Sequence, residues 1–172
     1  MKWISEKVEG LDQANPRTLL KINIFLSLFV ALAHGLPLLL IKHSELPAGF
    51  GIGYFTAPAA LIAALAGLVA HFRPALQQPV LKVHTAFLLL MGAYLLYFGI
   101  STLVVGIPEG TKFSWNPIFF AFVLAYPVYL ARRFLIPDTA PQSIAVRYAH
   151  VSVFLGSFPI SAAIIAKVAA QT

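Results

Sequence analysis

The sequence TAFLLLMGAYLLYFGISTLVV, residues 85–105, decides what kind of protein this chain is. It contains neither a charged residue nor a proline, and it belongs to a longer apolar block over residues 80–105. A helix needs about 20 apolar residues to cross the hydrocarbon core of a bilayer, and this block is long enough. We therefore predict a transmembrane helix here.

Four further apolar blocks surround this one, at residues 19–41, 54–71, 115–130 and 143–168. Polar segments separate them, including a short connection at 74–79 that has room only for an antiparallel turn. Hydrophobic residues make up 59% of the chain and charged residues 10%, against roughly half and a quarter in soluble domains. The prediction is an all-α, polytopic membrane helix bundle with five transmembrane helices in one domain, residues 19–172.

Residues 1–18 precede the first block, and we interpret them as a cytoplasmic interfacial segment. In a helix, four apolar side chains of this segment share one face: Trp3, Ile4, Val8 and Leu11. Charged side chains occupy the other face, so the pattern predicts a short N-terminal amphipathic helix in the membrane interface, ended by Asn15–Pro16. A solvated tail is the alternative.

Lysine and arginine are distributed unequally between the two sides of the predicted bundle. Nine lie on the side of the N-terminus: Lys2, Lys7, Arg17, Lys21, Arg73, Lys82, Arg132, Arg133 and Arg147. Three lie on the other side: Lys42, Lys112 and Lys167. Because basic residues accumulate in cytoplasmic loops, we expect a bacterial inner-membrane protein with a cytoplasmic N-terminus and an external C-terminus. The net charge of +6 then reflects topology and anionic lipid head groups, not nucleic acid.

The acidic residues all lie outside the apolar blocks: Glu6, Glu9, Asp12, Glu45, Glu109 and Asp138. Acidic side chains inside spans are typical of proton relays and cation pathways, so a cation- or proton-coupled pump is disfavoured. A hydrolase triad inside a span would lack its acid, and the chain has no cysteine for thiol chemistry. The sequence also contains no nucleotide-binding or zinc-protease motif. These observations disfavour an enzyme.

Histidines are the candidate ligands and acid–base groups at membrane depth. His71, His84 and His150 are all expected toward the cytoplasmic side. His84 and His150 have positions suited to the two axial ligands of a b-type haem, with His71 as a substitute for either. Gly92 and Gly156 would let the flat macrocycle approach the backbone. Three convergent histidines would instead suit zinc or copper, and the simplest interpretation is polar rings that reach the head-group region.

The last block carries the clearest spacing pattern. Small residues recur every seven positions: Ala149, Gly156, Ala163 and Ala170. Such a stripe lets another helix approach closely, so we predict a packing interface there. A polar stripe lies beside it: His150, Ser157 and Ser161. Similar small faces are expected in two other blocks, at Ala60, Ala63, Ala64 and Gly67 and at Gly92 and Gly99.

The leading hypothesis is a non-enzymatic integral membrane subunit or accessory protein that contacts membrane lipids and either other membrane subunits or copies of itself. One alternative is a small carrier or channel for a neutral or anionic substrate, with prolines opening a cavity: Pro37, Pro58, Pro127 and Pro159. The other is a b-type haem or quinone-interacting electron-transfer protein. Four tyrosines would line its quinone site, or else form aromatic belts: Tyr94, Tyr97, Tyr126 and Tyr129.

The charge distribution yields a topology prediction. Alkaline phosphatase fused after Thr172 is expected to be active, because the positive-inside rule places that end outside. Green fluorescent protein inserted in the segment 132–142 is expected to fluoresce in the cytoplasm. Enzyme activity and fluorescence of the reciprocal fusions provide the controls, and the opposite pattern would show the reverse orientation.

Overall fold

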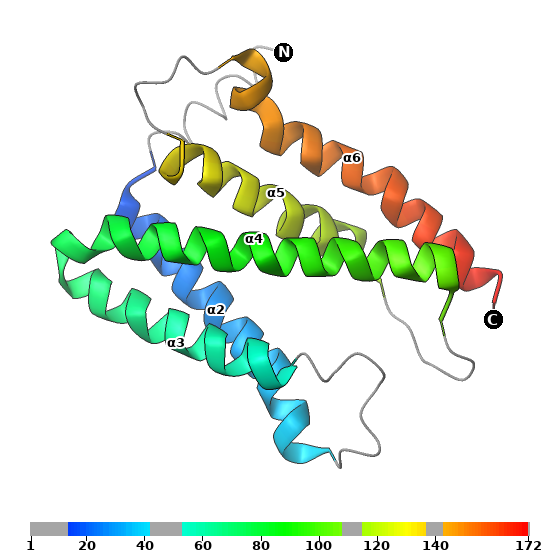
Figure 1. The fold of residues 1–172 in the computed structure, drawn as a ribbon, viewed down its shortest axis with the longest axis horizontal. Coiled ribbons are helices and arrows are strands. Elements are labelled where there is room, and N and C mark those ends of the chain that lie inside the picture. The colour runs from blue at the N-terminus through cyan, green and yellow to red at the C-terminus, as the bar shows by residue number, and fades with distance from the viewer. Residues whose placement is uncertain (1–13, 42–52, 108–114, 137–142, 172) are drawn as a thin grey trace. The chain divides into compact units, whose positions relative to one another are not determined.

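The computed structural model describes residues 14–41, 53–107, 115–136 and 143–171. Of these residues 90% are helical and none lies in a strand. The helices in chain order are α2 (Pro16–Leu40), α3 (Gly53–Phe72), α4 (Pro74–Val105), α5 (Pro117–Phe134) and α6 (Ile144–Ala169) (Figure 1). All five are long and apolar enough to cross a membrane, which fits the predicted helix bundle. The predicted amphipathic helix falls on residues 1–13, outside the described residues.

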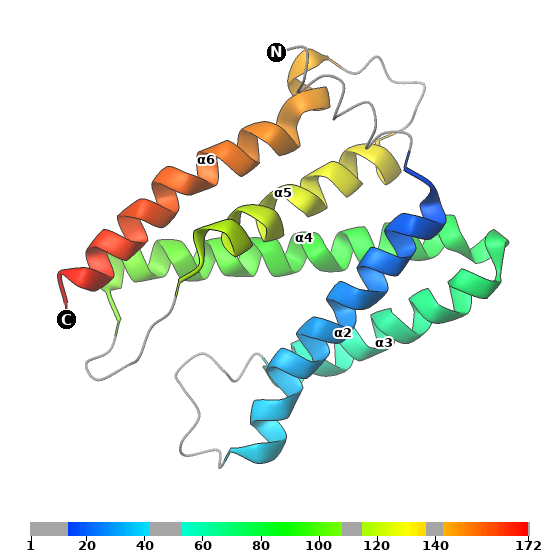
Figure 2. The ribbon, with the colours of Figure 1, turned by 180° about the vertical axis from the view of Figure 1, so that it is seen from behind.

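The chain divides into two compact units, Met1–His84 and Thr85–Thr172. In the first unit α2 packs along α3, and in the second α5 packs along α6 (Figures 1 and 2). Helix α4 is continuous, and the boundary between the units falls inside it.

Two helices begin at an asparagine followed by a proline. Asn15 Oδ1 accepts a hydrogen bond from the N–H of Arg17 at 2.9 Å, and Asn116 Oδ1 accepts from Ile118 and Phe119 at 3.0 Å. Asparagine satisfies N–H groups that have no partner in the first turn, and the following proline needs no partner for its own nitrogen. The same short motif therefore starts α2 and α5.

The end of α4 also follows from its sequence. The helix stops at Val105, and Gly106 adopts a φ of 88° while its N–H donates to the carbonyl of Thr102 at 3.0 Å. A residue with a side chain rarely adopts this left-handed conformation, whereas glycine does so readily. Helix α4 thus ends at Val105, where the apolar block over residues 80–105 ends.

The predicted connection at 74–79 is wrong. Helix α3 ends at Phe72 and α4 begins at Pro74, so Arg73 alone separates them. Pro74 occupies the first helical position, where no N–H is needed. Pro79 lies inside α4, but the carbonyl it leaves without a helical donor belongs to the second residue of the helix. Both prolines are therefore compatible with a helical start.

Helix α5 is longer than predicted, since it continues to Phe134. Arg132 and Arg133 were expected in a loop but lie in its last turn. Cationic side chains near a helix C-terminus interact favourably with its partial negative charge, which accounts for the extension. The two guanidinium groups therefore lie at the C-terminal end of α5.

The small face predicted on α3 is buried. Its members are Ala60, Ala63, Ala64 and Gly67. A Cβ atom added at Gly67 would lie 2.6 Å from Ile24 Cγ1 of α2 and 2.9 Å from His84 Cε1 of α4. Both distances are far below van der Waals contact, so the absence of a side chain at Gly67 leaves the space that Ile24 and His84 occupy.

Gly92 of α4 permits a similarly close approach in the second unit. A Cβ atom at Gly92 would lie 3.2 Å from the carbonyl oxygen of Val123. Pro127, four residues later in α5, has no N–H to give that carbonyl. The absent side chain of Gly92 thus lets a carbonyl without its helical donor approach the α4 backbone.

The glycine contacts generate a matched pair of substitutions. Gly67→Ala is expected to destabilise the protein by about 1–3 kcal/mol, because the new methyl group overpacks the contact with Ile24 and His84. Gly156→Ala is the control, since a Cβ there meets no atom within 4 Å. Thermal unfolding in mild detergent measures both. Equal stability of the two variants would contradict the assigned role of Gly67.

Candidate functional site

His84 is the most deeply buried of the predicted ligands. It is 1% exposed, and its Nε2 lies 2.7 Å from the carbonyl oxygen of Ala63 on α3. A carbonyl only accepts, so Nε2 carries the proton and donates it. Nδ1 is buried and has no hydrogen-bond partner among the described residues. The ring therefore sits over Gly67 and connects α4 to α3.

This geometry bears on the haem hypothesis for His84. Iron ligation through Nε2 would require the hydrogen bond to Ala63 to be broken, because a ligating nitrogen must offer its lone pair. His150 belongs to the second unit and is described with different neighbours. The bis-histidine haem site stays a prediction, and the contact with Ala63 gives His84 a packing role of its own.

His71 lies at the end of α3 and is half-buried. Its ring meets that of Phe72 edge-on, with centroids 5.2 Å apart and planes at 83°. Within residues 14–41, 53–107, 115–136 and 143–171, no group of three His, Cys, Asp or Glu side chains could hold a metal ion. His71 thus lies in the last turn of α3, and its interpretation as a ring that reaches the head-group region stays a prediction.

A second polar contact of the first unit was not predicted from the sequence. His34 Nδ1 of α2 lies 2.5 Å from Thr56 Oγ1 of α3, and Thr56 is buried. A hydroxyl can donate or accept, so this pair is satisfied with either histidine tautomer. The residues are 22 positions apart on different helices, and no spacing rule identifies such a pair.

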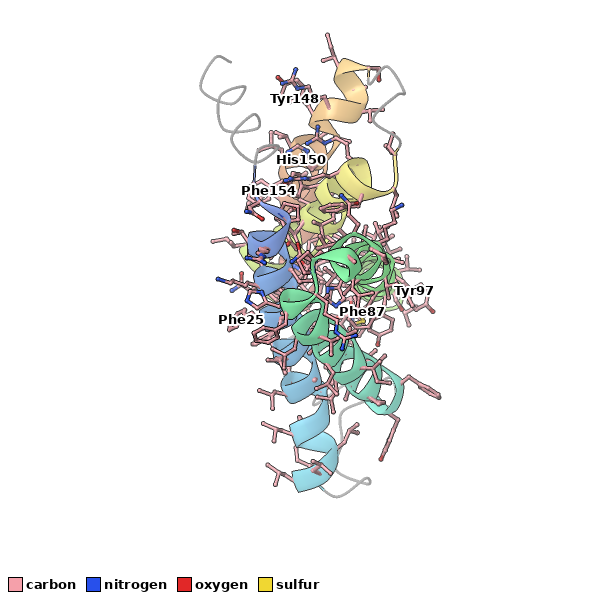
Figure 3. The ribbon with its side chains drawn as sticks, turned by 90° about the vertical axis from the view of Figure 1, so that its left-hand side faces the viewer. Phe25, Phe87, Tyr97, Tyr148, His150 and Phe154 are labelled. Atoms are coloured by element: carbon pink, nitrogen blue, oxygen red, sulfur yellow. The ribbon has the colours of Figure 1, made fainter. Side chains whose placement is uncertain are left out.

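His150 is buried in α6, one turn before Phe154 (Figure 3). Its ring meets Tyr129 of α5 at a centroid distance of 5.6 Å and an angle of 63°. Tyr129 is 3% exposed, and its hydroxyl accepts a hydrogen bond of 2.9 Å from Nη1 of Arg133. The Cζ atom of Arg132 lies 5.8 Å from the centre of the same ring. We call Tyr129, Arg132, Arg133 and His150 the Tyr129 cluster.

An aromatic row leads along α5 to this cluster. The rings of Phe122 and Tyr126 stack at 5.3 Å with planes 9° apart, and those of Tyr126 and Tyr129 at 6.3 Å and 27°. Tyr97 of α4, by contrast, is 70% exposed and projects away from its helix, as Phe25 does from α2 (Figure 3). Two of the four tyrosines proposed to line a site thus stack on each other.

The other end of the second unit is organised by Trp115. Its Nε1 donates to Ser161 Oγ at 3.1 Å, and its ring lies 4.7 Å from that of Phe120. Ser157 Oγ donates to the carbonyl of Phe154 at 2.7 Å. The polar stripe predicted on α6 is therefore buried, and its two serines are hydrogen-bonded within the unit.

The small-residue stripe of α6 is mostly exposed, in contrast to the buried polar stripe. Ala149 is half-buried, whereas Gly156, Ala163 and Ala170 are exposed. A Cβ atom at Gly156 would meet nothing within 4 Å. Among the five spans, α2 and α6 are the least buried and α5 the most. The residues suited to close helix contact are thus on an outward face.

The sequence matches no protein-family model, and no curated protein or solved structure is significantly similar to it. The function therefore has to be inferred from the residues themselves. Four polar sites of the described residues have been identified: His84 with Ala63, His34 with Thr56, the Tyr129 cluster, and Trp115 with Ser161.

The contact between His84 and Gly67 can be tested by a double-mutant cycle. His84→Ala is expected to destabilise the protein by roughly 2–4 kcal/mol, through a cavity and a lost hydrogen bond. Gly67→Ala should cost about 1 kcal/mol less in the His84→Ala background than in the parent, because one of its two close contacts has gone. Thermal unfolding in detergent provides the four values. Strict additivity would rule out a direct contact.

Proposed function

We propose that this protein is a non-enzymatic integral membrane subunit or accessory protein whose helix α6 packs against a helix of another membrane subunit or of a second copy. The supporting observation is the stripe of small residues on α6, which is exposed and open at Gly156. In this proposal the protein lies in a bacterial inner membrane with its N-terminus in the cytoplasm.

The physical basis is the weakness of the hydrophobic effect inside a bilayer. Lipid tails are as apolar as leucine, so helices associate through dispersion, backbone approach and weak hydrogen bonds, all of which small residues permit. The chain uses glycines in this way internally, at Gly67 and Gly92. The residues Gly156 and Ala163 have the same chemistry but lie on an exposed face.

The engaged polar groups support a role in assembly over one in catalysis. His84 is bonded to a backbone carbonyl, Ser161 to Trp115, and Ser157 to the carbonyl of Phe154. Each of these side chains therefore has a structural function within its own unit. A subunit that contributes surface and membrane anchorage needs nothing more from them.

Gly156→Leu tests this use of α6. The larger side chain would hold a partner helix away, and we expect the assembled species to fall about tenfold or more, which corresponds to roughly 1.4 kcal/mol. The protomer itself should fold normally, because the position is open within it. Native gels and chemical crosslinking in membranes measure the assembled fraction.

Ala162→Leu is the matched control, since Ala162 is also exposed on α6 but lies outside the stripe. It adds a similar volume to the same helix and should leave assembly intact. Unchanged assembly in Gly156→Leu, or the same loss in both variants, would count against an interface along the stripe.

A further inference from the structure

His84 has two ring nitrogens, and its contact with α3 uses only one of them. Nε2 donates to the carbonyl of Ala63, which places the ring proton there and leaves Nδ1 as an acceptor. The ring is 1% exposed, and no described residue donates to Nδ1. His84 lies about 15 Å along α4 from Pro74, so this acceptor is inside the span. A buried polar atom of this kind normally bonds to a protein group, a water molecule or an ion.

The unused nitrogen lies where α2, α3 and α4 meet in the first unit. Nδ1 is bonded to Cε1, and both Cε1 and Ile24 of α2 lie against Gly67 of α3. On α2 the buried positions next to Ile24 are polar, since Asn23 and Ser27 are at most 1% exposed. The buried side chains of α3 around this point are small and have no donor: Ala60, Ala63, Ala64, Gly67 and Ala70. They therefore offer Nδ1 no hydrogen bond.

A second buried polar group without a partner lies on the same face of α4. Gln77 precedes His84 by seven residues, which is two helical turns or about 10 Å. Its side chain is 8% exposed, and its Nε2 has no hydrogen-bond partner within the described part of the chain. This amide nitrogen only donates, whereas Nδ1 of His84 only accepts. The ligand chemistry that serves both groups is neutral and includes a donor as well as an acceptor.

Two other kinds of site fit these groups less well. A proton relay through His84 would need Nε2 to pass its proton on, but Nε2 donates to a backbone carbonyl, which does not take up a proton. A metal site needs several ligands. No group of three His, Cys, Asp or Glu side chains among the described residues could hold a metal ion.

We propose that the first unit contains a binding site for a small neutral hydrogen-bond donor, centred on Nδ1 of His84 and entered from the side of Gln77. Water is the smallest such ligand, and a small hydroxyl compound has the same chemistry. The ligand donates to Nδ1, and the amide of Gln77 donates to the molecules that lead to it. Because Ala63 already holds Nε2, the ring is oriented before the ligand binds. The site does not depend on a partner of α6.

Solid-state NMR of the full-length protein in bilayers tests this site. Histidine is isotopically labelled, and magnetisation is transferred to its nitrogens from the protons of water. We expect Nδ1 of His84 to receive it, and correlation with the backbone of Val83 and Thr85 assigns the signal. If Nδ1 receives magnetisation only from protein and lipid protons, the site is dry and the proposal is wrong. A signal that appears only after treatment with a chelator would show a bound metal ion and would also overturn the proposal.

Gln77→Leu tests the entry side of the site. Loss of one hydrogen-bonding group should weaken the transfer from water to His84 about fivefold, which corresponds to about 1 kcal/mol. Gln78→Leu is the matched control, because Gln78 is the next residue and is exposed. It should leave the transfer unchanged, and circular dichroism verifies the folding of both variants. Equal transfer in the two variants would contradict entry past Gln77.

Glycerol distinguishes water from a small hydroxyl compound as the ligand. If the transfer from water to Nδ1 of His84 stays unchanged in its presence, the site holds water. A contact from the carbon-bound protons of glycerol to Nδ1 would assign the site to a hydroxyl compound instead. Both results support a neutral donor at His84, whereas the dry site described above excludes one.

Discussion

A backbone amide in hydrocarbon has no water to bind, so each N–H and C=O must find its partner in the protein. Within each of the five helices, most backbone N–H and C=O groups bond to each other. The groups that cannot do so lie at helix ends and beside prolines. Asn15 and Asn116 satisfy N–H groups at the starts of α2 and α5. Gly106 ends α4 with a bond to the carbonyl of Thr102. The carbonyl of Val123, which Pro127 cannot serve, faces Gly92.

The same constraint explains why glycine and histidine matter so much here. Once the backbone is satisfied within each helix, helices associate only as closely as their side chains allow. Gly67 permits both Ile24 and His84 to reach α3, and His84 then donates to the second lone pair of a helical carbonyl at Ala63. A small residue on one helix thus creates the space that a polar residue on another fills.

The sequence predicted the features that depend on local composition. The apolar blocks correspond to five helices, the small face of α3 is buried, and α4 ends at Val105 with the apolar block. The errors arose where a local signal had two meanings. Proline signals a turn but is also tolerated at a helix start, so α4 begins at Pro74. Arginine signals a loop but also suits a helix C-terminus, so α5 continues past Arg132.

Contacts between side chains of different helices could not be predicted from the sequence, because the spacing of two residues along the chain does not show how their helices are aligned. Three such contacts are His34 with Thr56, His150 with Tyr129, and Trp115, which precedes α5, with Ser161 of α6. Each of these residues, taken alone, can be explained without any contact to another helix. Their positions nevertheless share a logic. In the second unit Trp115 and the Tyr129 cluster occupy opposite ends of α5, and each joins a ring from α5 or its approach to a polar side chain of α6.

One ring contact at each end of α5 fixes the register of this helix against α6. At the N-terminal end of α5, the uncharged indole N–H of Trp115 donates to Ser161 of α6, which satisfies the one polar group of this ring. The other end carries Arg132 and Arg133 on Tyr129, where the partial negative charge of the helix C-terminus favours cationic side chains. Packing of α5 on α6 explains why the rings are there, whereas the end of the helix explains why arginines follow them.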